Sequence, residues 1–147
     1  MGQTYDYKAF PLAQPDPVTK QNFAWRPVLR VVIFHGHNQS RPIESVLDTG
    51  ADHSIFHGQI ARAIGITLES GIAHEFAGVK AGMKAVAYFH KVKLLIAGHT
   101  IEATVDFSND IAMGGILGQV GFFDNFAVRF DWTPNPPRFE IERITRN

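Results

Sequence analysis

The feature that most constrains this chain is the segment 46–52, Val-Leu-Asp-Thr-Gly-Ala-Asp, where an apolar strand runs directly into a carboxylate and a glycine turn. A carboxylate beside a buried strand needs a compensating partner, because desolvating the charge costs several kcal/mol. Gly50 permits a backbone geometry that brings main-chain N–H groups close to Asp48. Two such loops facing each other would hold paired carboxylates that share a proton, which is an arrangement for acid–base chemistry.

Short β-branched runs separated by glycine and proline turns dominate the rest of the chain. Strands are predicted over 28–34, 41–48, 85–96, 101–107, 127–132 and 138–142, and residues 66–73 are expected to be extended. In 101–107 the apolar residues alternate with Glu102, Thr104 and Asp106, which predicts a half-buried strand with these three on its polar face. A short helix is predicted over 56–64, capped by Ser54 and ended by Gly65.

Many short strands with little helix predict an all-β domain. Residues 1–26 carry three prolines (Pro11, Pro15 and Pro17) and no helical or strand period, so we expect an extended N-terminal arm. The remaining residues, 27–147, are expected to form a single domain, because the chain of 147 residues is large enough for one core and contains no internal repeat.

Charge and cysteine content exclude several classes of function. Fourteen basic and fourteen acidic residues cancel, so we expect no nucleic-acid partner and no membrane partner. The sequence contains no cysteine, which excludes disulfides, thiolate metal sites and a cysteine nucleophile. No apolar run has the length of a transmembrane span or the pattern of a signal peptide, so we expect a soluble, cytoplasmic protein.

The segment 48–52, Asp-Thr-Gly-Ala-Asp, resembles the active-site loop of the retropepsin-type aspartic proteases, which are the retroviral proteases and their cellular and bacterial relatives. A glycine-bearing segment at 76–82 follows at the distance of the family's flap. The segment 115–118, Gly-Ile-Leu-Gly, resembles the apolar-apolar-glycine signature near the family's C-terminus. This resemblance implies a closed, mostly antiparallel acid-protease barrel with one or two short helices.

The chain contains one Asp-Thr-Gly and no second copy, so a pair of such carboxylates requires two chains about a two-fold axis. We therefore expect a homodimer. The resemblance implies an aspartic endopeptidase in which Asp48 from each chain activates a water molecule and protonates the scissile carbonyl, with Thr49 and Gly50 shaping the dyad. It implies no cofactor and no metal.

The same resemblance implies where a peptide or protein substrate binds. The expected substrate-binding residues are Ala51, Asp52, Ala77, Gly78, Val79 and Ile116. A peptide held by these residues would lie as an added strand beneath the flap. Two positions depart from the family pattern. Gln119 stands where family members often carry an arginine paired with the equivalent of Asp52, and Lys80 stands at the flap tip, where an apolar residue is expected.

Three other interpretations remain open at the level of sequence. A dimeric binding module could keep this fold without useful turnover, and an isolated Asp-Thr-Gly also fits a carboxylate that caps a turn. A metal-dependent hydrolase would use the pairs His35/His37 or His53/His57, whose spacings suit ligands. Neither pair has a cysteine or an evident carboxylate to complete it, so we expect solvent-exposed turn histidines.

Overall fold

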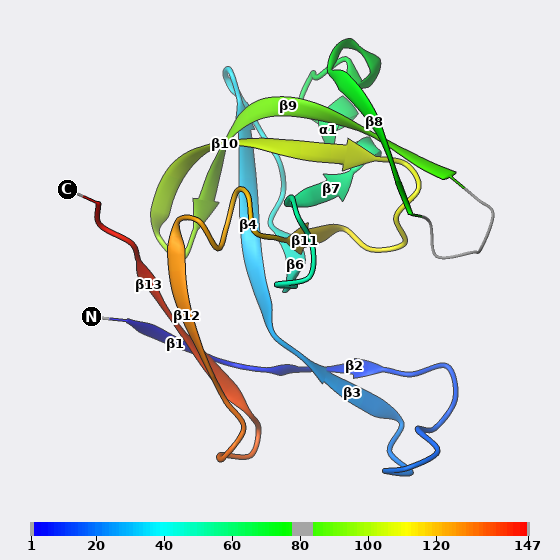
Figure 1. The fold of residues 1–147 in the computed structure, drawn as a ribbon, viewed down its shortest axis with the longest axis vertical. Coiled ribbons are helices and arrows are strands. Elements are labelled where there is room, and N and C mark those ends of the chain that lie inside the picture. Colours follow the sequence, from blue (N-terminus) through cyan, green and yellow to red (C-terminus); the bar gives the residue numbers. More distant parts are fainter. Residues whose placement is uncertain (1, 78–83, 147) are drawn as a thin grey trace.

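The computed structural model describes residues 2–77 and 84–146, and these form a barrel with a second, smaller sheet extending from it (Figure 1). The strands are β1 (Gln3–Asp6), β2 (Lys8–Pro11), β3 (Phe23–Arg26), β4 (Val28–His35), β5 (Asn38–Gln39), β6 (Ile43–Leu47), β7 (Ile55–His57), β8 (Ile72–Ala77), β9 (Lys84–Ile96), β10 (His99–Ser108), β11 (Gly115–Leu117), β12 (Phe126–Asp131) and β13 (Arg138–Arg143). The helix α1 (Gly58–Ala63) and the 3-10 helix η1 (Leu68–Ser70) are short. The all-β prediction is confirmed.

The largest sheet closes on itself. Its strands follow the order β5-β4-β6-β11-β7-β10-β9-β8, and β4 also pairs with β9, which joins β4, β6, β11, β7, β10 and β9 into a ring. The β6–β11 and β7–β10 pairs are parallel, whereas the other pairs in this sheet are antiparallel. Apolar side chains that alternate along the strands fill the interior, and Val31, Ile33, Leu94, Ile96 and Phe107 are fully buried.

Alternation in the sequence places most of the barrel strands correctly. Val92, Leu94 and Ile96 are buried on one face of β9, while Lys91 and Lys93 are exposed on the other. The interval 66–73 differs from the extended segment that was predicted, because η1 occupies its middle. Gly65 does end the helix as predicted, with a φ of 85° that suits glycine.

Two polar residues lie where the sequence did not place them. The N-cap of α1 is His57, whose Nδ1 accepts a hydrogen bond from Gln59 N–H at 3.1 Å, so the prediction that Ser54 caps this helix is wrong. Ser54 is instead fully buried beneath the loop after β6. Asp106 is buried, with 3% of its surface exposed, although its strand alternation put it on the polar face with Glu102 and Thr104.

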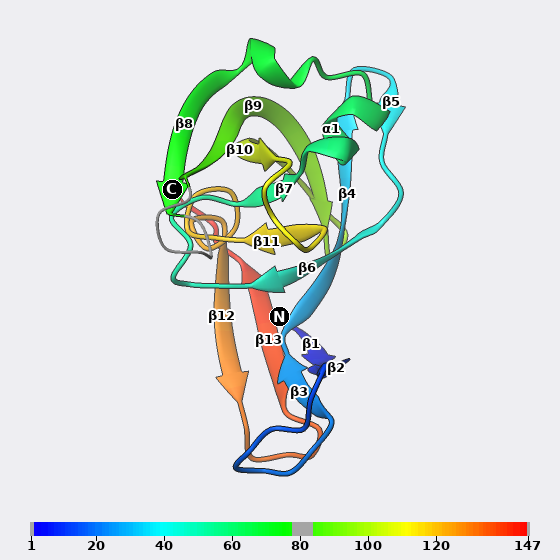
Figure 2. The same cartoon turned by 90° about the vertical axis from the view of Figure 1, so that its right-hand side faces the viewer.

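The second sheet has the order β1-β13-β12, and β2 and β3 form a separate two-stranded ribbon. Figure 2 shows both extending away from the barrel on the same side. The first 26 residues therefore include strands, which their sequence pattern did not indicate, because β1 pairs with β13 from the other end of the chain. Tyr7 is buried here between the rings of Trp132 and Phe139, at centroid distances of 5.5 and 5.9 Å. The division at residue 26 stays a prediction.

No helix in the described ranges is long and apolar enough to cross a membrane.

Candidate active site

Asp48 lies immediately beyond the end of β6, at the point where β6 runs beside β11. The parallel register pairs Leu47 with Leu117, and Asp48 N–H donates to the Leu117 carbonyl at 2.9 Å. Leu47 and Leu117 are buried, so the apolar ends of two strands fix the backbone from which Asp48 emerges. The sequence order of apolar strand, aspartate and glycine turn thus produces a carboxylate at the barrel surface.

The loop backbone orients the Asp48 carboxylate. Oδ1 accepts a hydrogen bond from Gly50 N–H at 2.9 Å, and the Asp48 carbonyl accepts one from Ala51 N–H at 3.1 Å. Asp48, Thr49 and Gly50 are all exposed in the single chain. In a single chain the Asp48 carboxylate is therefore open to water and carries little desolvation cost, and a second group can approach it.

The segment 118–120, which follows β11, holds the Asp48 loop in place through hydrogen bonds. Gln119 N–H donates to the Ala51 carbonyl at 2.9 Å, and Val120 N–H donates to the Asp52 carbonyl at 3.0 Å. The buried Ser54 hydroxyl accepts from Gly118 N–H at 3.0 Å. A Cβ on Gly118 would lie 2.6 Å from the carbonyl oxygen of Ala51, so only glycine fits this contact between two backbones.

Gln119 supplies a side-chain link between the two loops. Its Nε2 donates to the Thr49 carbonyl at 2.9 Å. This link joins a neutral amide to a main-chain carbonyl.

Replacing Gln119 with alanine is expected to lower the free energy of unfolding by about 0.5–1.5 kcal/mol, the usual net contribution of one hydrogen bond. Urea denaturation at fixed pH measures this difference. Gln14→Ala, in an exposed bend, is the matched control and is expected to change stability by less than about 0.5 kcal/mol. Equal effects of the two variants would show that the link to Thr49 contributes nothing.

The predicted substrate-binding residues fall into three groups. Ala51 and Asp52 lie in the loop after β6, and Ile116 is half-buried on β11, which pairs with β6. Ala77 ends β8 and pairs through its backbone with Lys84. The predicted flap positions Gly78 and Val79, together with Lys80 at the tip, lie outside the described residues.

The prediction that both histidine pairs are solvent-exposed holds for only one of them. His35 and His37 are exposed, but His53 and His57 are half-buried. Within residues 2–77 and 84–146, no three His, Asp or Glu side chains are grouped as a metal site would require.

Sequence reasoning missed one polar cluster next to the Asp48 loop. His74 Nε2 lies 2.7 Å from Asp106 Oδ2, and the His74 ring stacks on Phe89, whose edge meets the His53 ring. Burial raises the pKa of the Asp106 carboxyl, an effect that the neighbouring histidines oppose. Alternation placed Asp106 correctly on the face of β10 that also carries Glu102 and Thr104, but it gave no signal that His74, from β8, covers this face at Asp106.

Comparison with solved structures identifies the fold. The structure matches a retropepsin-like aspartic protease from Rickettsia conorii with a TM-score of 0.56 and 14% sequence identity, over 78% of this chain and 89% of that one. It also matches the retroviral protease-like domain of Ddi1 from Leishmania major (TM-score 0.49, 19% identity, 69% of this chain and 80% of that one). EIAV protease in complex with the inhibitor HBY-793 gives a TM-score of 0.46 and 23% identity, over 64% of this chain and 82% of that one.

No protein-family model matches the sequence, and no curated protein matches it. The resemblance that the sequence indicated is therefore confirmed at the level of fold: the chain adopts the retropepsin-like β-barrel.

Proposed function

We propose that this protein is an aspartic endopeptidase that works as a homodimer, with one Asp48 from each chain forming the catalytic pair. The observation that carries this proposal is the placement of Asp48. It is an exposed carboxylate, oriented by Gly50 N–H, at the end of a strand in a retropepsin-like barrel. A single chain carries one such loop, so the chemistry requires a second copy.

The reaction follows from two carboxylates close together. Like charges at hydrogen-bonding distance do not both ionise, so the pair shares one proton, as in known aspartic-protease dyads. The ionised Asp48 takes a proton from a water molecule, whose oxygen attacks the scissile carbonyl carbon, while the protonated Asp48 gives its proton to the carbonyl oxygen. The resulting diol collapses when the amide nitrogen is protonated and the C–N bond breaks, without a covalent enzyme intermediate.

Exposed apolar surface beside the loop supports the proposed dimer. Val120 is 41% exposed, although it directly follows Gln119 in the segment that holds the Asp48 loop. Val120 would be buried when a second copy binds through this loop about a two-fold axis.

The proposed substrate is an extended peptide. It would pair with the backbone near Asp52 and place side chains against Ile116, while the flap predicted at Ala77, Gly78 and Val79 covers it. No nucleic acid, membrane or cofactor takes part in this proposal.

The test is a digest of a peptide library at mildly acidic to neutral pH, with Asp48→Asn as the control. We expect cleavage by the wild type, inhibition by a peptide-like transition-state analogue, no effect of a chelator, and no cleavage by the variant. Cleavage that survives in Asp48→Asn refutes the role of Asp48. Tight peptide binding without cleavage by either protein favours the binding module, and activity abolished by a chelator favours a metal-dependent hydrolase.

A further inference from the structure

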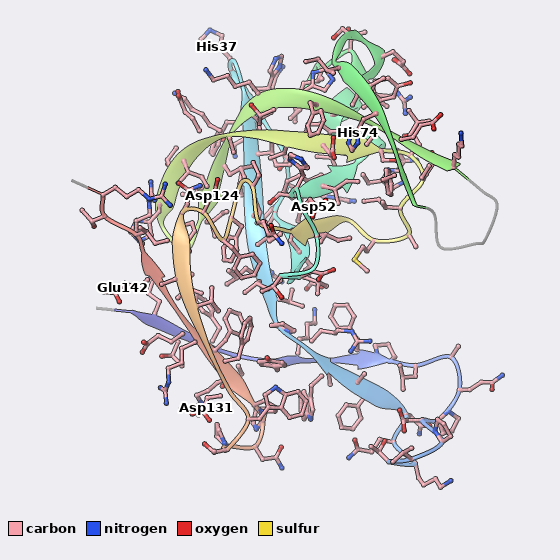
Figure 3. All side chains as sticks on the ribbon, viewed as in Figure 1. His37, Asp52, His74, Asp124, Asp131 and Glu142 are labelled. Carbon is pink, nitrogen blue, oxygen red and sulfur yellow. The ribbon has the colours of Figure 1, made fainter. Side chains whose placement is uncertain are left out.

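The polar cluster beside the active-site loop joins three strands of the barrel and the loop itself. His74 comes from β8, Phe89 from β9 and Asp106 from β10, and His53 directly follows Asp52 in the loop. The His74 and Phe89 rings are stacked with centroids 4.4 Å apart, and the His53 ring meets Phe89 at 4.7 Å and 66°. In Figure 3 the His74 side chain lies between β8 and the loop that carries Asp52.

The hydrogen bond between His74 and Asp106 is charge-assisted, which is a strong class of hydrogen bond. An ionised carboxylate only accepts, so His74 Nε2–H donates to Asp106 Oδ2 at 2.7 Å. The Asp106 side chain is only 5% exposed, and that of His74 is 31% exposed. Among the described residues, the other oxygen, Asp106 Oδ1, is buried without a partner, as is Nδ1 of His53. This buried pair costs desolvation energy that an apolar pair would not, so packing alone does not account for it.

Strand β8 depends on few contacts besides this bond. It is the last strand in the order of the large sheet, so within residues 2–77 and 84–146 its backbone pairs with β9 alone. Ile72 on β8 is 74% exposed, which indicates little apolar packing at that end. A second ion pair, between Glu75 on β8 and Lys84 on β9, spans 3.3 Å with side chains 58% and 79% exposed, so solvent screens it.

We propose that His74 and Asp106 are positioning residues for peptide hydrolysis: their hydrogen bond ties β8 to β10 beside the active-site loop, and acid weakens it. The bond is charge-assisted when Asp106 is ionised, and it weakens when Asp106 takes up a proton, because the neutral carboxyl keeps only an uncharged acceptor. The effect on hydrolysis rests on the proposed function, whereas the effect on β8 does not.

Burial moves this weakening to a higher pH than an exposed aspartate would show. Desolvation raises the pKa of Asp106, and the hydrogen bond and charge of His74 and the charge of His53 oppose this rise. The other ionisable groups on and next to these elements are Glu75 on β8, Lys84, Tyr88, His90, Lys91 and Lys93 on β9, His99 and Glu102 on β10, Asp110 after β10, Asp52 in the loop, and His57 at the end of β7, which pairs with β10. The two histidines are the groups that act on Asp106.

Hydrogen exchange tests the alignment of β8 without any need for activity. At neutral pH the amides of residues 73–77 are expected to exchange about tenfold faster in His74→Leu than in the wild type, because a charge-assisted hydrogen bond is lost. Asp106→Asn is expected to abolish the acid-induced change, because its amide does not titrate. Glu75→Gln, which removes the exposed ion pair on the same strand, is the matched control and should change exchange by less than about twofold.

Kinetics then test the effect on hydrolysis. His74→Leu is expected to raise KM for a peptide about tenfold while kcat changes by less than about threefold, and His74→Gln, which keeps a donor, should restore much of the loss. The pH at which kcat/KM falls on acidification is expected to differ between Asp106→Asn and the wild type. If β8 exchange in His74→Leu equals that in Glu75→Gln, the proposal is wrong whatever the activity. If exchange behaves as expected but the wild type cleaves no peptide, the proposed function fails and the structural role of the pair stands.

Discussion

Asp48→Asn is expected to lower kcat for peptide hydrolysis by about a thousandfold or more, because the variant has neither a general base nor a general acid at the reacting centre. The substitution keeps size and shape, and the amide oxygen of the new side chain can still accept a hydrogen bond from Gly50 N–H. Since Asp48 is exposed in the single chain, the free energy of unfolding of the monomer should change by less than about 0.5 kcal/mol. Initial rates with a cleaved peptide and a denaturation curve give both numbers.

The dimer formed by Asp48→Asn provides a second readout. Bringing two Asp48 carboxylates together requires one of them to take up a proton, whereas two asparagine amides need none, so the variant is expected to dimerise at least as tightly. Glu102→Gln is the control, because Glu102 is an exposed carboxylate on β10 that lies outside the pair and outside the predicted substrate-binding residues. A variant at Asp48 that keeps more than about a tenth of the wild-type kcat would contradict the assignment.

Gly118→Ala is expected to have the second-largest effect. The added Cβ would lie 2.6 Å from the carbonyl oxygens of both Ala51 and His53, and neither backbone can turn aside as a side chain could. Relieving the overlap moves the Asp48 loop away from the segment behind it. We expect a loss of stability of about 1–3 kcal/mol and a fall in kcat/KM of about a hundredfold, since a displacement of about 1 Å disturbs the catalytic geometry.

Gly114→Ala is the control for this effect. The atom nearest to its added Cβ would be Cγ2 of Ile43, at 3.1 Å. This is a side-chain atom whose position can adjust. Thermal unfolding and peptide cleavage are measured for both variants. If Gly118→Ala keeps wild-type kcat/KM, the Asp48 loop does not depend on its fit against Gly118.

Local sequence pattern predicts much of this barrel and of its candidate site. Alternating apolar residues specify β9 and β10, because each residue's burial follows from which face it lies on. The Asp48 loop could be found because its chemistry is contained in five consecutive residues. Its backbone support from Gly118 and Gln119 was anticipated only through the resemblance to a family.

Long-range contacts explain what the pattern did not reveal. Tyr7 and strand β1 are ordered by partners more than a hundred residues away, such as Phe139. Asp106 lies on the predicted face of β10 but is buried, because alternation assumes that a polar face is open to solvent, whereas His74, from β8, covers Asp106 and pairs with it. The prediction that Ser54 caps the following helix failed for a similar reason. The Ser54 hydroxyl instead accepts a hydrogen bond from Gly118 N–H.

The most direct test of the central claim measures dimer fraction and specific activity over the same dilution series. If one Asp48 from each chain forms the catalytic pair, specific activity falls on dilution with the same midpoint as the dimer fraction from sedimentation. An equal mixture of wild-type and Asp48→Asn chains should then lose activity in proportion to the mixed dimers that form. Specific activity that stays constant while the protein becomes monomeric would contradict the account.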